Sequence, residues 1–384
     1  MRLYDYTGAV VFDSARETGE VGTSAPFNFS AISEAAAVNT GLTKSYHAIS
    51  GVLGELQYVG GICVNKKIYC APNKAQSILV YDTEAERLYT IGDSLGNFKF
   101  KYTGAVYWQG YVYLIPRGVN TMLRIDPISD DVTVIDLGTT YPVTPYGDYR
   151  DSHHYNGAIS EDGFLYCPPA YSSNKLLKIN MRNFEWEELD FNSSDVSTWI
   201  GCVKHPTQNK IIFLSTKVFR VWDCDTDTFT DVNDGVTRPC YDMVYDPRYE
   251  AFIGFYSRIG EAQGGGGNIF ALKTSDWSCI DSGYINYLGT GYGASIGPDG
   301  HYYHIEGAGV YDFTFDGTSF VQQTSITTSD NVGSGRTLNA GQAIDNDGNI
   351  YGIPGNGVLT KLTFGNVVKG WPDAIVSSQY YGKY

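Results

Sequence analysis

The chain has 384 residues, 42% of them hydrophobic, with 44 Gly, 31 Tyr and 18 Phe. This content excludes a disordered chain and favours strands and turns over helices. The formal net charge is −15, and no Lys/Arg cluster offsets it, so we expect no nucleic-acid partner and no anionic membrane surface.

The N-terminal sequence carries no recognisable targeting signal. Residues 1–14 lack an apolar segment of signal-peptide length, and no stretch approaches the roughly 18 apolar residues of a membrane span. We therefore expect cytoplasmic synthesis, no membrane insertion, and virion association as one route to the outside.

The first 57 residues form a segment of their own. A hairpin is expected from Leu3 to Asp13, turning near Thr7-Gly8, followed by a short helix over Ala31–Val38. We interpret residues 1–57 as an attachment or latch segment, and residues 372–384 as a C-terminal tail.

Residues 58–371 repeat one unit, which is clearest between Tyr102 and Gly138. Its pattern predicts four short strands, Gly104–Trp108, Tyr111–Pro116, Met122–Ile125 and Val132–Asp136, with a tight turn at Gln109-Gly110. One such sheet cannot bury both of its faces alone, whereas copies stacked around an axis can.

The repeat occurs seven times. Its openings lie at Gly61, Gly104, Gly157, Gly201, Asp242, Gly293 and Gly341. This spacing is close to the roughly 40–50 residues of a four-stranded blade. The sequence therefore predicts an all-β fold, a seven-bladed β-propeller of four-stranded antiparallel blades.

Several strands share a Tyr-x-x-Pro pattern: Tyr69 to Pro72, Tyr113 to Pro116, Tyr166 to Pro169 and Tyr351 to Pro354. Together with the phrases ILVYDTEAERL and LRIDPISDDV, these strands make residues 58–371 resemble the YVTN and kelch-like propeller families. The resemblance implies the architecture and leaves the activity open, because such repeats serve binding proteins and enzymes alike.

The densest polar stretch is the long connection before the third blade. It contains Tyr146, Asp148, Arg150, Asp151, His153 and His154. These residues can bind a sugar or another ligand, and the carboxylate and histidines can ligate a metal. Adjacent histidines on an extended segment point to opposite sides, so a loop that packs over the channel is the competing interpretation.

Equivalent loops of other blades place basic and aromatic residues on the same predicted face. The candidates for ligand contact are Lys101, Arg117, Trp199, Arg238 and Arg336. Arginine and aromatic residues are typical of protein and glycan contact surfaces. Propeller loops also carry such residues without any binding role.

The sequence contains no motif for a cofactor or a metal. The turns at Asp223 to Asp227 and Asp345 to Gly348 resemble calcium loops only in their first positions and lack the closing glutamate. The seven cysteines are odd in number and lack paired zinc spacing, so we expect free thiols. No cofactor, metal or catalytic residue is predicted.

These observations favour a non-enzymatic binding or structural module. It would recognise a protein or glycan surface through propeller loops and join a larger assembly, such as a phage tail or virion, through residues 1–57. The alternative is a propeller lyase or hydrolase acting on a carbohydrate, with His153 or His154 as base and Arg150 as electrostatic partner.

Ring closure is the remaining structural question. The seventh blade has clear strands at Gln342–Ile344, Ile350–Pro354 and Val358–Leu362, but its fourth, Val367–Trp371, is weakened by Gly370 and Pro372. We therefore expect an N-terminal segment, Gly8–Asp13 or Ser50–Tyr58, to pair with this blade or with a neighbouring subunit.

Overall fold

The structure is a computed structural model of the whole chain. It describes residues 2–4, 10–13 and 43–48, and residues 57–364 except 93, 97–98, 139–153, 155, 171–173, 192–198, 216–217, 233–239, 241, 258–266, 283–292, 307–308, 324–325, 328–338, 346 and 356–357. Within these residues every regular element is a strand. None of the described segments is a helix with the length and hydropathy needed to cross a membrane.

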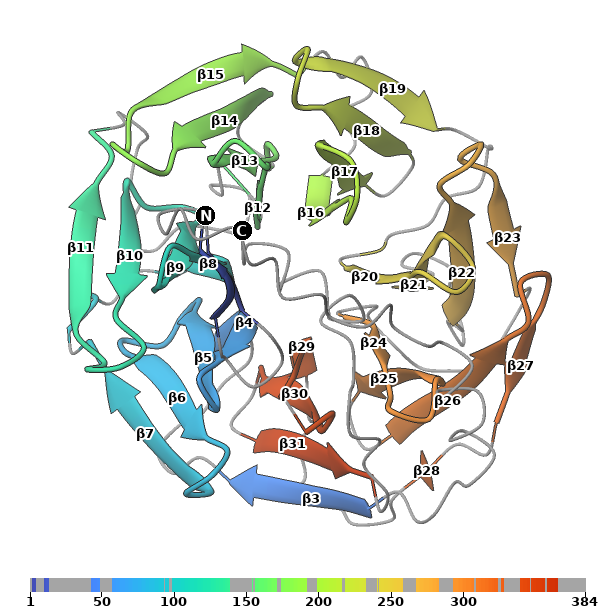
Figure 1. Ribbon diagram of the computed structural model, residues 1–384. Helices are drawn as coiled ribbons and strands as arrows, with labels where there is room; N and C mark the ends of the chain where they lie inside the picture. Colours follow the sequence, from blue (N-terminus) through green and yellow to red (C-terminus); the bar gives the residue numbers. More distant parts are fainter. Residues whose placement is uncertain are drawn as a thin grey trace.

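Seven antiparallel sheets surround a central axis, each with its first strand innermost (Figure 1). Six sheets have four strands, and the sixth blade has a short fifth strand that pairs, like the fourth, with the third strand. The prediction of a seven-bladed propeller is confirmed. Most of its strands coincide with the alternating apolar segments of the sequence, as expected for sheets that bury both faces between neighbours.

The first four blades follow one another along the chain. Blade 1 contains β4 (Tyr58–Val64), β5 (Lys67–Pro72), β6 (Ile78–Asp82) and β7 (Arg87–Ile91). Blade 2 contains β8 (Tyr102–Trp108), β9 (Tyr111–Pro116), β10 (Thr121–Ile125) and β11 (Val132–Asp136). Blade 3 contains β12 (Ala158–Ile159), β13 (Phe164–Cys167), β14 (Lys175–Asn180) and β15 (Trp186–Asp190). Blade 4 contains β16 (Trp199–Lys204), β17 (Lys210–Ser215), β18 (Phe219–Asp223) and β19 (Thr228–Val232).

The last three blades complete the ring. Blade 5 contains β20 (Met243–Asp246), β21 (Ala251–Ser257), β22 (Gly267–Lys273) and β23 (Cys279–Asp281). Blade 6 contains β24 (Ser295–Ile296), β25 (Tyr302–Glu306), β26 (Gly309–Phe315), β27 (Phe320–Gln322) and β28 (Ile326–Thr327). Blade 7 contains β29 (Asn339–Ile344), β30 (Ile350–Pro354), β31 (Val358–Thr363) and β3 (Thr43–Ala48).

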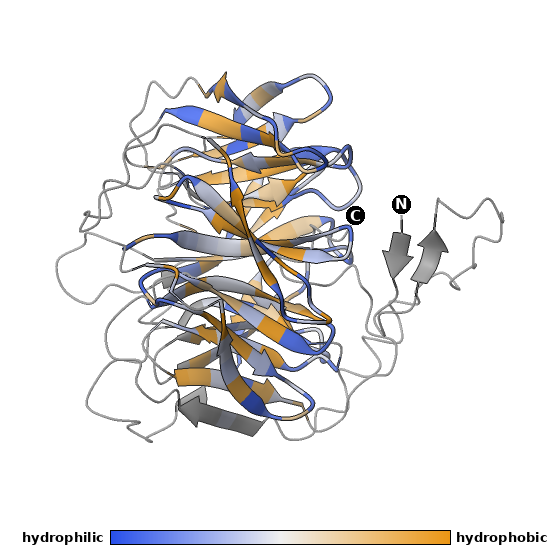
Figure 2. Cartoon of the chain, turned by 90° about the vertical axis from the view of Figure 1, so that its left-hand side faces the viewer, coloured by the Kyte–Doolittle hydropathy of each residue, from blue (hydrophilic) through white to orange (hydrophobic). Residues whose placement is uncertain are grey.

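Alternating strand direction gives the ring two different faces. The turns that join first to second and third to fourth strands lie on one face, which we call the turn face. The loops between second and third strands and the connections between blades lie on the other, the loop face. In side view the strands carry much of the hydrophobic colour and several turns are hydrophilic (Figure 2). Gln109 and Gly110 both have positive φ, 46° and 90°, as the predicted tight hairpin turn requires.

The ring is closed by an N-terminal strand. β3 pairs antiparallel with β31, from Thr43 opposite Thr363 to Ala48 opposite Val358. The expectation that an N-terminal segment pairs with the seventh blade is confirmed, but the segment is neither of the two proposed. Val10–Asp13 (β2) pairs instead with Arg2–Tyr4 (β1), as the predicted hairpin requires. Residues 50–56 lie outside the described residues, as do Val367–Trp371 and the helix expected at 31–38.

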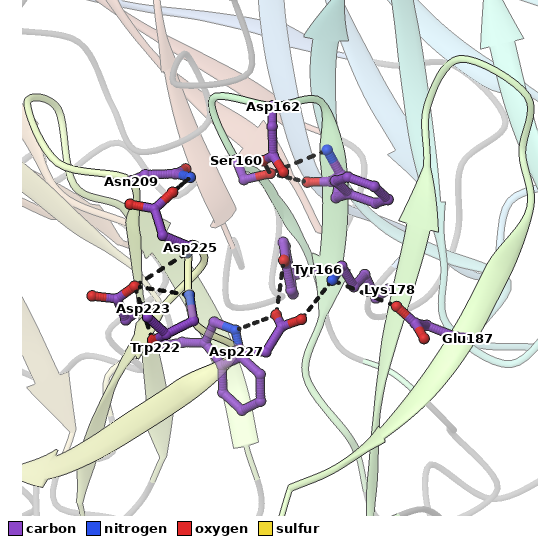
Figure 3. A network of polar contacts seen from close by, with 12 residues as sticks. Ser160, Asp162, Tyr166, Lys178, Glu187, Asn209, Trp222, Asp223, Asp225 and Asp227 are labelled. Carbon is purple, nitrogen blue, oxygen red and sulfur yellow. Dashed lines mark hydrogen bonds and ion pairs between the residues drawn. The ribbon is translucent and has the colours of Figure 1, made fainter.

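Neighbouring blades are joined by carboxylates in their outer turns. Asp227, in the turn between β18 and β19 of blade 4, accepts hydrogen bonds from Tyr166 Oη at 3.2 Å and Lys178 Nζ at 2.7 Å, both in blade 3 (Figure 3). Asp130 does the same between blades 2 and 1, accepting from Tyr69 and Lys67 at 2.8 and 2.9 Å. These bonds satisfy tyrosine hydroxyls that would otherwise be buried between apolar sheets.

At the start of each innermost strand there is little space for a side chain. The ladder registers align seven residues, Gly60, Gly104, Asn156, Gly201, Asp242, Gly293 and Gly341. Gly104 has φ +76°, and a Cβ there would lie 2.1 Å from Oδ1 of Asn156. The repeated glycines of the sequence therefore reflect close approach between neighbouring inner strands.

Candidate functional site

A series of backbone hydrogen bonds runs along the loop face and links four blades. The Gln57 amide donates to the Gly355 carbonyl at 2.8 Å, and the Asn73 amide donates to Gln57 at 2.8 Å. The Lys101 amide then donates to Asn73 at 3.0 Å, and the Arg117 amide to Lys101 at 2.8 Å. We call this series the backbone belt. It fixes the positions at which each first strand begins and each second strand ends.

The belt continues into blade 3 at His154. Its amide donates to the Arg117 carbonyl at 3.2 Å, and the residue forms an isolated bridge with Pro169. His154 is 2% exposed. Three of the residues predicted as ligand contacts, Lys101, Arg117 and His154, are therefore brought together by consecutive backbone hydrogen bonds.

Cationic side chains gather around one aromatic ring beside this belt. The Arg117 guanidinium lies 4.7 Å from the Phe100 ring centroid, and Lys74 Nζ lies 5.5 Å from it. Lys101 Nζ donates to the Lys74 carbonyl at 3.4 Å. Phe100 has a φ of 58°, a backbone conformation that costs energy for a bulky residue and persists only where its surroundings impose it. We call Lys74, Phe100, Lys101 and Arg117 the cation cluster.

Burial sets the electrostatics of this cluster. Lys101 and Arg117 are only 1% and 4% exposed. Burial disfavours the charged ammonium and lowers the pKa of Lys101 from 10.5 to about 8. A positive charge held out of water interacts more strongly with a nearby anion than one on an open surface does.

The other predicted ligand contacts divide into two groups. Trp199 does not join the cation cluster, since it is 2% exposed and packs edge-on against Phe191, with the Arg220 guanidinium 5.2 Å from its ring. It belongs to the core of blade 4. Seven predicted contacts lie outside the described residues: Tyr146, Asp148, Arg150, Asp151, His153, Arg238 and Arg336.

Lys74 and Phe100 were not among the predicted contacts. Lys74 lies one residue after Asn73, whose place behind Pro72 matches that of Arg117 behind Pro116, so the repeat indicates the face on which this loop lies but does not single out Lys74. Phe100 lies between Lys99 and Lys101, but its left-handed conformation has no sequence signature.

In the turns that resembled calcium loops, the first Asp side chain accepts hydrogen bonds from backbone amides of the same turn. Asp223 Oδ1 accepts the amides of Asp225 and Thr226 at 3.1 and 3.3 Å, and Asp345 Oδ1 accepts those of Asp347 and Asn349, each at 2.9 Å. These bonds are backbone turn chemistry of the kind that favours Asp. In the described part of the chain no three His, Cys, Asp or Glu residues form a group able to hold a metal.

Comparison with known proteins defines the fold and leaves the family open. No protein-family model matches this sequence, and no curated protein matches it. Among solved structures, the extracellular domain of the putative one component system BT4673 from B. thetaiotaomicron aligns over 82% of this chain with a TM-score of 0.57 and 13% identity. The chain spans 39% of the length of that protein.

Two further similar structures have different functions. Kuenenia stuttgartiensis hydrazine synthase aligns with a TM-score of 0.59 and 13% identity, over 84% of this chain and 100% of the other. YCF48 bound to D1 peptide aligns with a TM-score of 0.55 and 10% identity, over 83% and 94%. At such identities the likeness concerns the fold alone, and this chain is a seven-bladed β-propeller.

Proposed function

We propose that this protein is a non-enzymatic binding module that recognises the surface of a protein or glycan with its loop face, through an anionic group held at the cation cluster. The observation that supports this most is the convergence of Lys74, Lys101 and Arg117 from two blades. Such a concentration of positive charge stands out in a chain of net charge −15. Peptide capture is supported by a propeller of similar fold, YCF48, which is bound to a D1 peptide.

The wider setting is a larger assembly, such as a phage tail or virion. This part of the proposal rests on the general character of the sequence, a Tyr- and Gly-rich β body preceded by a short segment. Because β3 belongs to the ring, the attachment would use residues 1–42 and leave the opposite loop face open to a partner.

Binding to defined probes tests the proposal. We expect the protein to bind immobilised poly-glutamate peptide or sialylated glycan and to bind the uncharged counterpart of each probe weakly. Replacing a charge that contacts the partner costs about 1.5–3 kcal/mol, so Lys101→Met and Arg117→Met should each weaken binding by at least about tenfold. The matched control is Lys66→Met, because Lys66 is exposed on the turn face and pairs with Glu84.

The outcomes are distinct. Loss of binding in both loop-face variants, with melting temperatures near that of the unmodified protein and normal binding by Lys66→Met, supports the proposal. Equal affinity in all variants, or no preference for anionic over uncharged probes, overturns it.

A further inference from the structure

A histidine and two carboxylates form a compact cluster on the turn face of blade 6. His301 Nδ1 lies 2.9 Å from Asp312 Oδ1 and 3.9 Å from Asp299 Oδ2. Asp299 also accepts a hydrogen bond from Tyr303 Oη at 2.6 Å. Both carboxylates are largely buried, with side chains 8% and 12% exposed. Two buried carboxylates this close to one imidazole repel each other unless that imidazole is protonated.

This cluster touches the place where the ring closes. Tyr303 is fully buried, and its ring packs edge-on against Phe364 at a centroid distance of 5.3 Å. Phe364 directly follows β31, the strand that pairs with β3. Tyr303 and Phe364 also share a hydrophobic cluster with Leu362 of β31 and Ile350 of β30. We call the β3–β31 pair, with this cluster behind it, the seam.

The charges that face His301 come from three elements. Asp299 lies on its own turn, between β24 and β25, and Asp312 lies on β26 of the same blade. Arg248, on the first turn of blade 5, donates to the Gly300 carbonyl at 2.8 Å and opposes protonation of His301. Arg248 is itself paired with the buried Asp246 at 2.6 Å. The negative groups nearest to the imidazole therefore outnumber the positive one.

We propose that His301 is a proton-operated lock on the seam: when protonated it neutralises Asp299 and Asp312, which holds Tyr303 against Phe364 and keeps β31 and β3 paired, and when neutral it releases them. The lock concerns ring closure, and its test is independent of whether the loop face binds a ligand.

The direction of the effect follows from the titration of His301. Burial lowers the pKa of His301, but the hydrogen bond to Asp312 and the charges of Asp299 and Asp312 outweigh it and raise that pKa above 6.5. The stability contributed by the protonated imidazole is therefore complete below 6.5 and lost as pH rises through the folded-state pKa. The seam should be tightest in mildly acidic solution.

Hydrogen exchange of the full chain, corrected for the intrinsic pH dependence of exchange, measures the seam directly. One unit of pKa shift is a tenfold change in the opening equilibrium, so between about pH 5.5 and about pH 8.5 we expect exchange of β31 and β3 amides to rise at least about threefold. β9 of blade 2 serves as the internal reference. His301→Gln should exchange fast at both pH values, and Asp312→Asn should exchange slowly at both.

His304→Gln is the matched control, because this buried histidine, which lies on β25, bonds the Gly293 carbonyl through Nδ1 and stacks on Phe255. In this variant the ratio of β31 and β3 exchange rates at the higher and lower pH should equal that of the unmodified protein, even if the substitution lowers stability. A ratio in His301→Gln equal to that of the unmodified protein overturns the lock. So does a seam that changes no more than β9 in the unmodified protein, a comparison that needs no variant to fold.

Discussion

At the scale of single residues, buried polar groups join neighbouring blades on one face of the ring and hold the cation cluster on the other. Asp130 and Asp227 turn the outer hairpin of one blade into an acceptor for the tyrosine and lysine of the blade before it. Lys101 and Arg117 occupy the opposite face, where the backbone belt holds them. Asp130 and Asp227 therefore lie on the face of the ring opposite to Lys101 and Arg117.

Lys101 should titrate well below an ordinary lysine. Burial lowers its pKa from 10.5 to about 8, so the unfolded chain binds more protons in that interval and the stability due to this group should rise with pH between those values. Rates of amine acylation against pH, followed residue by residue by mass spectrometry, measure the midpoint. Lys99, which is exposed, is the internal control. A midpoint of Lys101 that coincides with that of Lys99 would contradict the burial argument.

Asp227→Asn should weaken the boundary between blades 3 and 4. The change removes the charged acceptor of Lys178 and weakens that of Tyr166, and hydrogen bonds of this kind contribute about 1–2 kcal/mol to the free energy of unfolding. Chemical denaturation measures the loss. Asp225→Asn is the control in the same exposed turn, where the carboxylate accepts from Asn209 within its own blade, and it should cost less than about 0.5 kcal/mol. Equal costs would show that the inter-blade bonds contribute nothing.

At the scale of strands, burial decreases from the inside of each blade to its outside, and this gradient decides what the sequence reveals. Every residue of β4 and β8 is buried, whereas β7 and β11 are half exposed. Inner strands therefore show long apolar patterns, and outer strands show weak ones. The same gradient places the tightest steric limits at the inner strands, where the glycine positions lie.

Comparing Gly104→Ala with Gly110→Ala separates the cost of backbone strain from the cost of a steric collision. Both glycines have positive φ, +76° and +90°, so each substitution costs roughly 1 kcal/mol in backbone strain. A Cβ at Gly104 would also collide with Asn156 of blade 3, whereas nothing lies within 4 Å of one at Gly110. Gly104→Ala should therefore lower the free energy of unfolding by about 1 kcal/mol more than Gly110→Ala, because the Asn156 side chain must move to make room. Similar decreases in the free energy of unfolding of the two variants would show that Asn156 moves aside at little cost.

The elements that sequence predicted and those it missed differ for physical reasons. β9 and β30 were predicted with their observed bounds because Tyr-x-x-Pro closes a buried apolar strand. β3, TKSYHA, was missed because an outer strand pairs on one side only and needs no apolar alternation. Lys101 and Arg117 were placed on one face by the repeat. The convergence of Arg117 and Lys74 on Phe100 depends on a loop backbone that no pattern encodes.

At the scale of the whole molecule, the ring is a closed structure held by a strand from the other end of the chain. Thr43 lies opposite Thr363, so the chain enters β3 and leaves β31 at the same end of blade 7, on the turn face. Closure removes the exposed sheet edge of β31 and the open apolar face between blades 7 and 1. Both the proposed attachment through residues 1–42 and the proposed lock at His301 depend on this closure.

A disulfide across the β3–β31 pair tests closure most directly. Paired residues of antiparallel strands have Cα atoms about 4.5–5.5 Å apart, which a disulfide spans. Ser45→Cys with Lys361→Cys should therefore oxidise within one chain, in a background where the half-buried Cys279 is replaced by serine, and should raise the melting temperature. Ser45→Cys with Thr133→Cys, on the outer strand of blade 2, is the control and should not cross-link within a chain. A monomer that carries the engineered disulfide between β3 and β31 is the result predicted; covalent dimers, which would mean that β3 is donated to a second copy, or no bond at all would contradict a ring closed by its own N-terminal strand.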